Sequence, residues 1–115
     1  MCGICGIFGD SSESALERMM DAMVHRGPDS SGTFVDDRLQ FGMRRLKIID
    51  LDGSEQPIAN EDGSVIVICN GEIYNYRSLR AQLEDRGHRF STDGDVETIV
   101  HLYEEYGADC ARYLD

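Results

Sequence analysis

Basic residues are scarce in this sequence, and their scarcity limits what the protein can bind. Eleven basic residues, ten of them arginine, stand against 22 acidic ones, so the formal net charge is -11. Proteins that bind nucleic acid cluster lysine and arginine to neutralise phosphates, whereas the longest basic stretch here is Arg44-Arg45 with Lys47. We therefore expect no nucleic-acid partner.

Long hydrophobic runs and several nucleotide- and metal-binding motifs are missing as well. The longest purely apolar run, Val65 to Cys69, is far shorter than the roughly 20 residues that a transmembrane helix needs. The chain contains no Walker A loop, GxGxxG fingerprint, HExxH pair or EF-hand loop. The basic region of a secretory signal does not appear among the first residues. We expect a protein without a membrane partner, located in the reducing cytoplasm.

The sequence does contain enough apolar residues for a folded domain. Its 115 residues are 41% apolar, which allows one domain. Periodicity and turn signals predict a strand, a helix, several strands including a hairpin, and two final helices. The expected strands are Ile4–Phe8, Thr33–Val35, Leu39–Met43, Leu46–Leu51 and Val65–Cys69, and the expected helices start at Ser14, Asn75 and Asp95. This order predicts an α+β fold with an antiparallel sheet.

Local signals predict how the helices begin and end. Ser14 and Glu17 fit a capping box, Asn75 and Asp95 are suitable N-cap residues, and Gly87 is a suitable residue after a helix end. The run Val65–Cys69 is β-branched and predicts a strand that is buried on both faces. Apolar and aromatic side chains at helical spacing predict the following buried or half-buried residues: Leu16, Met19, Met20, Met23, Tyr74, Tyr76, Tyr103 and Tyr106.

Cys2 is a candidate nucleophile because of its place in the chain. Removal of the initiator Met would leave a thiol and a free α-amine on one residue. The pKa values of a cysteine thiol, roughly 8.5, and of an α-amine, roughly 7.7–8.0, ordinarily differ by less than one unit. The amine can therefore accept the thiol proton, and the thiolate can attack a carbonyl carbon such as that of a side-chain amide. The alternative is a small apolar residue near a terminus.

Cys2 and Cys5 also have the C-x-x-C spacing of metal and redox sites. In an extended chain, however, residues three apart point to opposite faces and cannot share one ion. The three histidines, His25, His88 and His101, show no spacing typical of a metal site, so we expect surface or packing roles for them. No metal ligands are therefore predicted, and the metal or redox site remains the weaker alternative.

Other polar residues have the chemistry of a substrate site. Asn70 and Gly71 supply the amide and backbone N–H donors that an oxyanion hole uses, although Asn-Gly is also a common turn. The guanidinium of Arg45 matches a carboxylate, and the alternative is a charge at a strand edge. Asp95 could bind an ammonium group, cap a helix, or do both with its two oxygens.

Several short motifs in a fixed order give the sequence a family resemblance. The motifs are Met1-Cys2-Gly3-Ile4, Arg26-Gly27-Pro28-Asp29, Arg45-Leu46-Lys47-Ile48-Ile49-Asp50, Gln56-Pro57, Asn70-Gly71-Glu72-Ile73-Tyr74-Asn75 and Gly94-Asp95-Val96-Glu97. Over essentially its whole length the chain resembles the N-terminal glutaminase domain of glutamine-hydrolysing asparagine synthetases. These are class II amidotransferases of the N-terminal-nucleophile (Ntn) hydrolase type.

The resemblance implies a role for each matched residue. Cys2 would be the nucleophile, and its own amine the general base. Asn70 and Gly71 would form the oxyanion hole. The substrate L-glutamine would be bound by the residues Arg45 (α-carboxylate), Asp95 (α-ammonium) and Glu72 (pocket wall). No cofactor is expected for glutamine hydrolysis itself.

The resemblance also implies a fold and a larger protein. The family fold is an αββα sandwich of two antiparallel sheets, and residues 1–115 would be the N-terminal part of it, truncated before its later strands. The C-terminal synthetase domain of the same chain would use ATP and Mg²⁺ and consume the ammonia in asparagine synthesis. A homodimer is among the assemblies that the family implies. The alternative to an enzyme is a non-catalytic fragment or binding module.

Overall fold

The computed structural model describes residues 2–10, 12–46 and 55–115, and these residues form two compact units. The first unit contains 2–10, 12–46, 55–57 and 68–70 of the described residues. The second contains 58–67 and 71–115. Both units combine helices with antiparallel strands, as expected for an α+β fold. None of the described helices is both long and apolar enough to cross a membrane.

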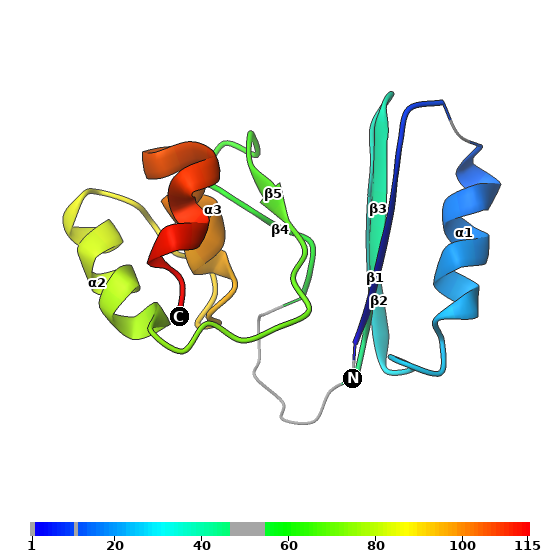
Figure 1. Ribbon diagram of the computed structural model, residues 1–115, viewed down its shortest axis with the longest axis horizontal. Helices are drawn as coiled ribbons and strands as arrows, with labels where there is room; N and C mark the ends of the chain where they lie inside the picture. Colours follow the sequence, from blue (N-terminus) through cyan, green and yellow to red (C-terminus); the bar gives the residue numbers. More distant parts are fainter. Residues whose placement is uncertain (1, 11, 47–54) are drawn as a thin grey trace. The chain divides into compact units, whose positions relative to one another are not determined.

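A three-stranded antiparallel sheet forms the centre of the first unit (Figure 1). Its strands are β1 (Gly3–Phe8), β2 (Ser30–Val35) and β3 (Leu39–Arg45), with β3 in the middle. Strands β2 and β3 form the predicted hairpin. At its turn the Asp36 carboxylate accepts hydrogen bonds from the backbone N–H groups of Arg38 and Leu39, which lower the pKa of Asp36.

Helix α1 (Glu13–Ala22) covers one face of this sheet and confirms the predicted amphipathic helix (Figure 1). Leu16 and Met20 are buried, and the Met20 side chain lies directly over Gly42 of β3. The expected burial of Met19 is wrong, because 38% of this residue is exposed. The expected capping box is also wrong: the helix begins before Ser14, with Ser12 at the N-cap and no side-chain cap bond.

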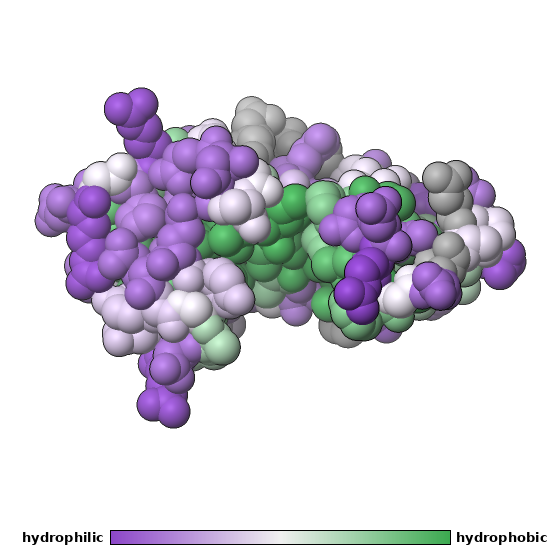
Figure 2. All heavy atoms as spheres, turned by 90° about the horizontal axis from the view of Figure 1, so that it is seen from above, coloured by the Kyte–Doolittle hydropathy of each residue, from purple (hydrophilic) through white to green (hydrophobic). Residues whose placement is uncertain are grey.

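The described residues of the second unit form two short strands, two α-helices and a 3₁₀ helix. Strands β4 (Ile58–Ala59) and β5 (Ile66–Val67) pair antiparallel, and α2 (Tyr76–Asp85), α3 (Glu97–Tyr106) and the 3₁₀ helix η1 (Gly107–Tyr113) follow. The core of the unit consists of Ile73, Leu79, Leu83, Leu102 and Cys110. Hydrophilic side chains cover the helical side of this unit, at the left of Figure 2.

Gly87 ends α2 as the sequence predicts. Its φ is +99°, a conformation that L side chains rarely adopt. The N–H of Gly87 donates to Glu84 and the N–H of His88 donates to Leu83, which is the hydrogen-bond pattern of a Schellman motif. These hydrogen bonds at the end of α2 therefore fix the position of the His88 backbone.

Two further predictions from the sequence are wrong, and a third concerns residues that lie mostly outside the described ranges. The predicted doubly buried strand at Val65–Cys69 is wrong, because only Ile66–Val67 is a strand and all five residues are half-buried. Tyr74 and Tyr103 are exposed rather than packed. Most of the predicted strand Leu46–Leu51 lies outside the described residues, and Leu46 itself is not in a strand.

Candidate functional site

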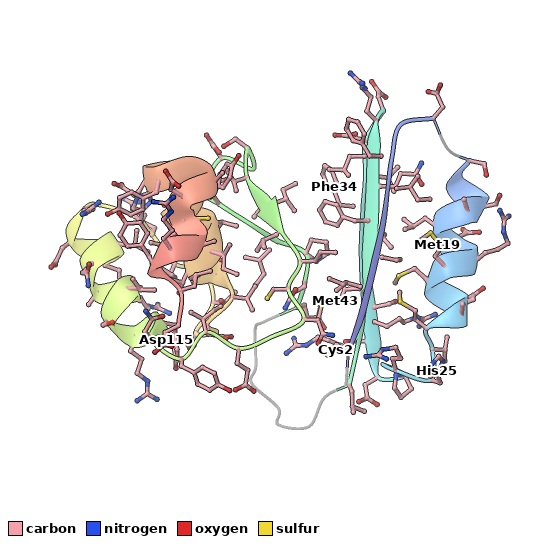
Figure 3. All side chains as sticks on the ribbon, viewed as in Figure 1. Cys2, Met19, His25, Phe34, Met43 and Asp115 are labelled. Atoms are coloured by element: carbon pink, nitrogen blue, oxygen red, sulfur yellow. The ribbon has the colours of Figure 1, made fainter. Side chains whose placement is uncertain are left out.

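Cys2 and Asn70 lie together in the first unit although 68 positions separate them in the chain. Asn70 Nδ2 donates a hydrogen bond to the backbone oxygen of Cys2 at 3.1 Å. Arg26 Nε donates to the same oxygen, also at 3.1 Å. Cys2 is half-buried and lies just before β1, where Figure 3 labels it. Two side chains from distant segments thus hold the main chain of the candidate nucleophile.

The side chain of Gln56 holds the segment that carries Asn70. Its Oε1 accepts from the N–H of Cys69 at 2.7 Å, and its Nε2 donates to the carbonyl of Cys69 at 3.2 Å. The amide therefore pairs with Cys69 as a neighbouring strand would. Gly32 in β2 permits this arrangement, because a Cβ there would collide with the carbonyl oxygen of Gln56 and with Pro57.

The Arg26-Gly27-Pro28-Asp29 loop lies against the end of β3. A Cβ on Gly27 would collide with the backbone of Arg44 and Arg45, so only glycine fits this close approach. The N–H of Asp29 donates to the carbonyl of Arg45 at 3.1 Å. The loop thereby brings the Arg26 side chain to Cys2. No local signal in the sequence predicts these contacts of Arg26 and Gln56, because each side chain binds a residue that is distant in the chain.

The two arginines that end β3 point to opposite faces of the sheet. Arg44 Nε donates to the carbonyl of Met20 at 3.2 Å, and Arg44 Nη2 lies 3.5 Å from Asp21 Oδ1, so this side chain is bound to α1. Arg45 alternates with it and shares the face of Met43, which Figure 3 shows on the side opposite α1.

Arg45 also lies close to Cys2 in the strand register. Arg44 pairs with Gly3, so Arg45 and Cys2 each lie one residue beyond that pair. The Arg45 side chain lines a small cavity of about 10 Å³, together with residues Ser30, Ser31, Gly32, Met43, Glu55 and Gln56. The candidate carboxylate-binding residue is therefore placed at the Cys2 end of the sheet.

The remaining predicted site residues, Gly71, Glu72 and Asp95, belong to the second unit. Glu72 is exposed and Asp95 is half-buried. Asp95 Oδ2 accepts a hydrogen bond from the N–H of Ile73 at 2.6 Å, which holds the segment just after Gly71 and Glu72. The structure thus joins Cys2, Asn70 and the Arg45 end of β3 in one unit, and Asp95 with the 71–73 segment in the other.

The expected N-cap role of the Asp95 side chain is wrong. Helix α3 has Val96 at its N-cap position and no side-chain cap bond. The backbone carbonyl of Asp95 accepts from Thr98 instead, in a tight first turn. Its carboxylate is directed to Ile73, and the first turn of α3 contains the buried Glu97.

Cysteine pairing and metal binding were the alternatives for the C-x-x-C spacing. No disulfide joins Cys2, Cys5, Cys69 and Cys110, all of which lie in the described ranges. Cys5 lies in the extended strand β1, where burial raises its pKa. Within the described ranges, the group of side chains that has the composition of a metal site contains no cysteine. It consists of Glu61, His88, His101 and Glu104, in the second unit.

Comparison with known proteins gives a family and several relatives. A family model described as a glutamine amidotransferase domain matches residues 1–115. The chain is 42% identical over 121 residues to the glutamine-hydrolyzing asparagine synthetase 1 of Bacillus subtilis (strain 168), covering 99% of the chain and 19% of the relative. It is 46% identical over 114 residues to synthetase 2 of the same organism (93% and 15%). It is 42% identical over 120 residues to synthetase 1 of Arabidopsis thaliana (100% and 20%). The chain thus spans a fifth or less of the length of these relatives.

Proposed function

Because the chain belongs to the glutamine amidotransferase domain family, we propose that it hydrolyses glutamine to glutamate and ammonia, with Cys2 as the nucleophile. The observation that carries this proposal is the hydrogen bond from Asn70 Nδ2 to the Cys2 carbonyl. It brings the candidate nucleophile and the candidate oxyanion donor into contact across 68 positions. A local Asn-Gly turn does not by itself explain a contact with a residue so distant in the chain.

The first chemical step transfers a proton within Cys2. After removal of the initiator Met, the α-amine accepts the thiol proton and the thiolate attacks the side-chain carbonyl carbon of glutamine. The carbonyl oxygen becomes an oxyanion. An amide NH₂ has two hydrogens, so Asn70 can hold the Cys2 carbonyl with one and donate the other to the oxyanion. The backbone N–H of Gly71 is the proposed second donor.

Ammonia leaves in the second step. The α-ammonium of Cys2 returns its proton to the departing nitrogen, the C–N bond breaks, and a thioester remains on Cys2. Water then adds to the thioester, with the amine again as base, and releases glutamate and the free thiol. No cofactor takes part in either step.

Substrate binding is proposed to use the two charged groups on the glutamine α-carbon, the carboxylate and the ammonium. Arg45 is the proposed ligand of the α-carboxylate, because it lies on the sheet face opposite Arg44 and lines the cavity at the Cys2 end of the sheet. Asp95 is the proposed ligand of the α-ammonium. One of its oxygens accepts from Ile73, and a carboxylate has a second oxygen for the substrate. Glu72 is proposed as a further residue of the glutamine site, as the family resemblance implies.

The whole protein is proposed to use the ammonia. The relatives are named as glutamine-hydrolyzing asparagine synthetases, and we extend that activity to the protein of which this chain is part. Residues 1–115 would then belong to an αββα Ntn-hydrolase sandwich in the cytoplasm. A synthetase domain with ATP and Mg²⁺ would follow, and the protein would form a homodimer.

The test is a Cys2→Ala variant of the full-length protein, with Cys5→Ala as the matched control. Cys2→Ala should abolish release of ammonia from glutamine and leave synthesis from free ammonia intact, because only the nucleophile is lost. Cys5→Ala should retain both activities. Intact mass spectrometry should show that Met1 is removed from the active protein. Glutaminase activity in Cys2→Ala, or an active protein that keeps Met1, would overturn the assignment.

A further inference from the structure

Four side chains of the second unit converge from three parts of the chain. Glu61 lies in the turn between β4 and β5, and His88 follows the Gly87 that ends α2. His101 and Glu104 lie one turn apart on α3 (Figure 1). One nitrogen or oxygen atom from each of the four residues lies within 4.8 Å of the others. His101 is completely buried, and the His88 side chain is 13% exposed.

The geometry of the four groups is close to that of a tetrahedral metal site. His101 Nδ1 lies 3.0 Å from Glu104 Oε2 and 3.6 Å from Glu61 Oε2. His88 Nδ1 lies 3.2 Å from Glu104 Oε2 and 3.9 Å from Glu61 Oε1. Bonds of about 2.0–2.1 Å to a tetrahedral zinc place neighbouring ligand atoms about 3.3–3.4 Å apart. Two of the four separations, 3.0 and 3.2 Å, are shorter than this spacing, and the other two, 3.6 and 3.9 Å, are longer.

The hydrogen bonds around the cluster orient these atoms inward. His88 Nε2 lies 2.8 Å from Glu105 Oε1, and an ionised carboxylate can only accept, so Nε2 is the donor and Nδ1 is the nitrogen that faces the cluster. Glu104 Oε1 accepts from Asn60 Nδ2 at 2.8 Å, and Glu61 Oε1 accepts from the N–H of Arg89 at 2.7 Å. Partners of this kind commonly fix the ligands of a metal from behind.

Both imidazole rings direct a nitrogen at the carboxylate of Glu104. His88 Nδ1 lies 3.2 Å from Glu104 Oε2. His101 Nδ1 faces the same carboxylate at 3.0 Å. The two ring centroids are 5.0 Å apart, so the rings lie beside one another at the cluster. One divalent cation among these atoms would be bound by all four side chains and would balance the charge of the two carboxylates.

We propose that Glu61, His88, His101 and Glu104 form a structural zinc site in the second unit. Two imidazole nitrogens and two carboxylate oxygens are ligands that zinc accepts in tetrahedral geometry. Because four protein ligands complete that geometry, no position is left open for a reacting water, and the ion serves the fold. It joins the β4–β5 turn, the segment after α2, and helix α3. The proposal is independent of glutamine hydrolysis.

The test measures zinc directly on the full-length protein after removal of metal with a chelator. We expect one Zn²⁺ bound per chain at this site, and a higher melting temperature with Zn²⁺ than with the chelator. Co²⁺ should give the visible d–d absorption of a tetrahedral complex without the near-ultraviolet charge-transfer band of a thiolate. That band would assign the metal to cysteine and overturn the proposal.

Variants locate the ion. His88→Gln and Glu104→Gln each remove a partly exposed ligand of the ion. Loss of an outer partner, a residue that hydrogen-bonds a ligand, typically weakens metal binding about 10–100-fold. Each of these two variants should weaken Zn²⁺ binding by more than that. Glu105→Gln removes such an outer partner and should weaken it within that range. His25→Gln and Glu84→Gln are the matched controls and should bind as the parent does. Circular dichroism verifies that each variant is folded. Stoichiometric binding that survives in folded His88→Gln and Glu104→Gln, or no binding to the parent, would overturn the proposal.

Discussion

At the scale of the residue, Arg44 and Arg45 show how position in a strand separates two identical side chains. Arg44 is tied to α1 through the Met20 carbonyl and Asp21. Arg45 lies on the opposite face and lines the cavity beside Gln56. The two arginines are neighbours in the sequence, and the family resemblance implies Arg45 as the ligand of a substrate carboxylate. Strand alternation separates them, because adjacent residues of a strand cannot share a face.

The two arginines are therefore expected to respond differently to lysine. Arg45→Lys loses the bidentate geometry of the guanidinium and should raise the KM for glutamine about 10–100-fold, since a charged hydrogen bond contributes about 1.5–3 kcal/mol. Arg44→Lys should lower the melting temperature and leave the KM unchanged. Steady-state glutaminase kinetics and thermal unfolding of the full-length protein measure both effects. The reverse pattern would mean that the assignment is wrong by one residue.

Residue-level prediction from the sequence succeeds where the signal is local. The apolar spacing of Leu16 and Met20 predicts their burial because both face one side of a helix. Gln56 has no such signal: its partner, Cys69, is 13 residues away, and nothing in either residue type encodes the pairing. The same holds for His88 and His101, which no motif spacing connects. Their convergence depends on how α2 ends and on how α3 packs.

At the scale of the element, β2 and the Gln56 side chain support the Asn70 segment together. The carbonyl of Gln56 approaches Gly32 so closely that no Cβ fits. The side chain of Gln56 then pairs with Cys69 through both of its amide atoms. A displacement of Gln56 should therefore be transmitted to Asn70, the next residue in the chain.

Gly32→Ala should disturb both stability and activity. The new methyl group must displace the Gln56 backbone, and overpacking of this kind costs about 1–3 kcal/mol in the free energy of unfolding. Gly6→Ala, in β1, is the matched control. Its Cβ would come no closer than 3.3 Å to other atoms, so its neighbours need to move by far less and the loss of stability should be smaller. Denaturant unfolding and glutaminase kcat measure the two variants, and equal losses would contradict the role given to Gly32.

The boundaries of helices and turns, like the contacts of single residues, can be predicted from the sequence only where the signal is local. The Asp36 turn and the Gly87 helix end follow from residue types that prefer those conformations, and both were predicted. The start of α3 was not, because the Asp95 carboxylate accepts from Ile73 rather than from its own helix. A tertiary hydrogen bond thus replaced the local one that the sequence favoured.

At the scale of the whole molecule, the chain passes between its two units three times among the described residues. The crossings fall after Pro57, after Val67 and after Asn70. Residues 68–70 are thus a short return to the first unit, held there by Gln56 and by the contact of Asn70 with Cys2. The proposed zinc ligands all lie in the second unit, and the proposed nucleophile lies in the first.

Hydrogen exchange measured by mass spectrometry should separate the two units. Zn²⁺ should slow exchange in the β4–β5 hairpin, at the end of α2 and in α3, because the ion binds the folded unit and raises the free energy of its opening. Exchange in β1, β2 and β3 should not change. His88→Gln should abolish the effect, whereas His25→Gln should leave it. If exchange slowed equally in both units, the molecule would open as one cooperative body. If zinc slowed exchange only in the first unit, the ion would not be bound by Glu61, His88, His101 and Glu104.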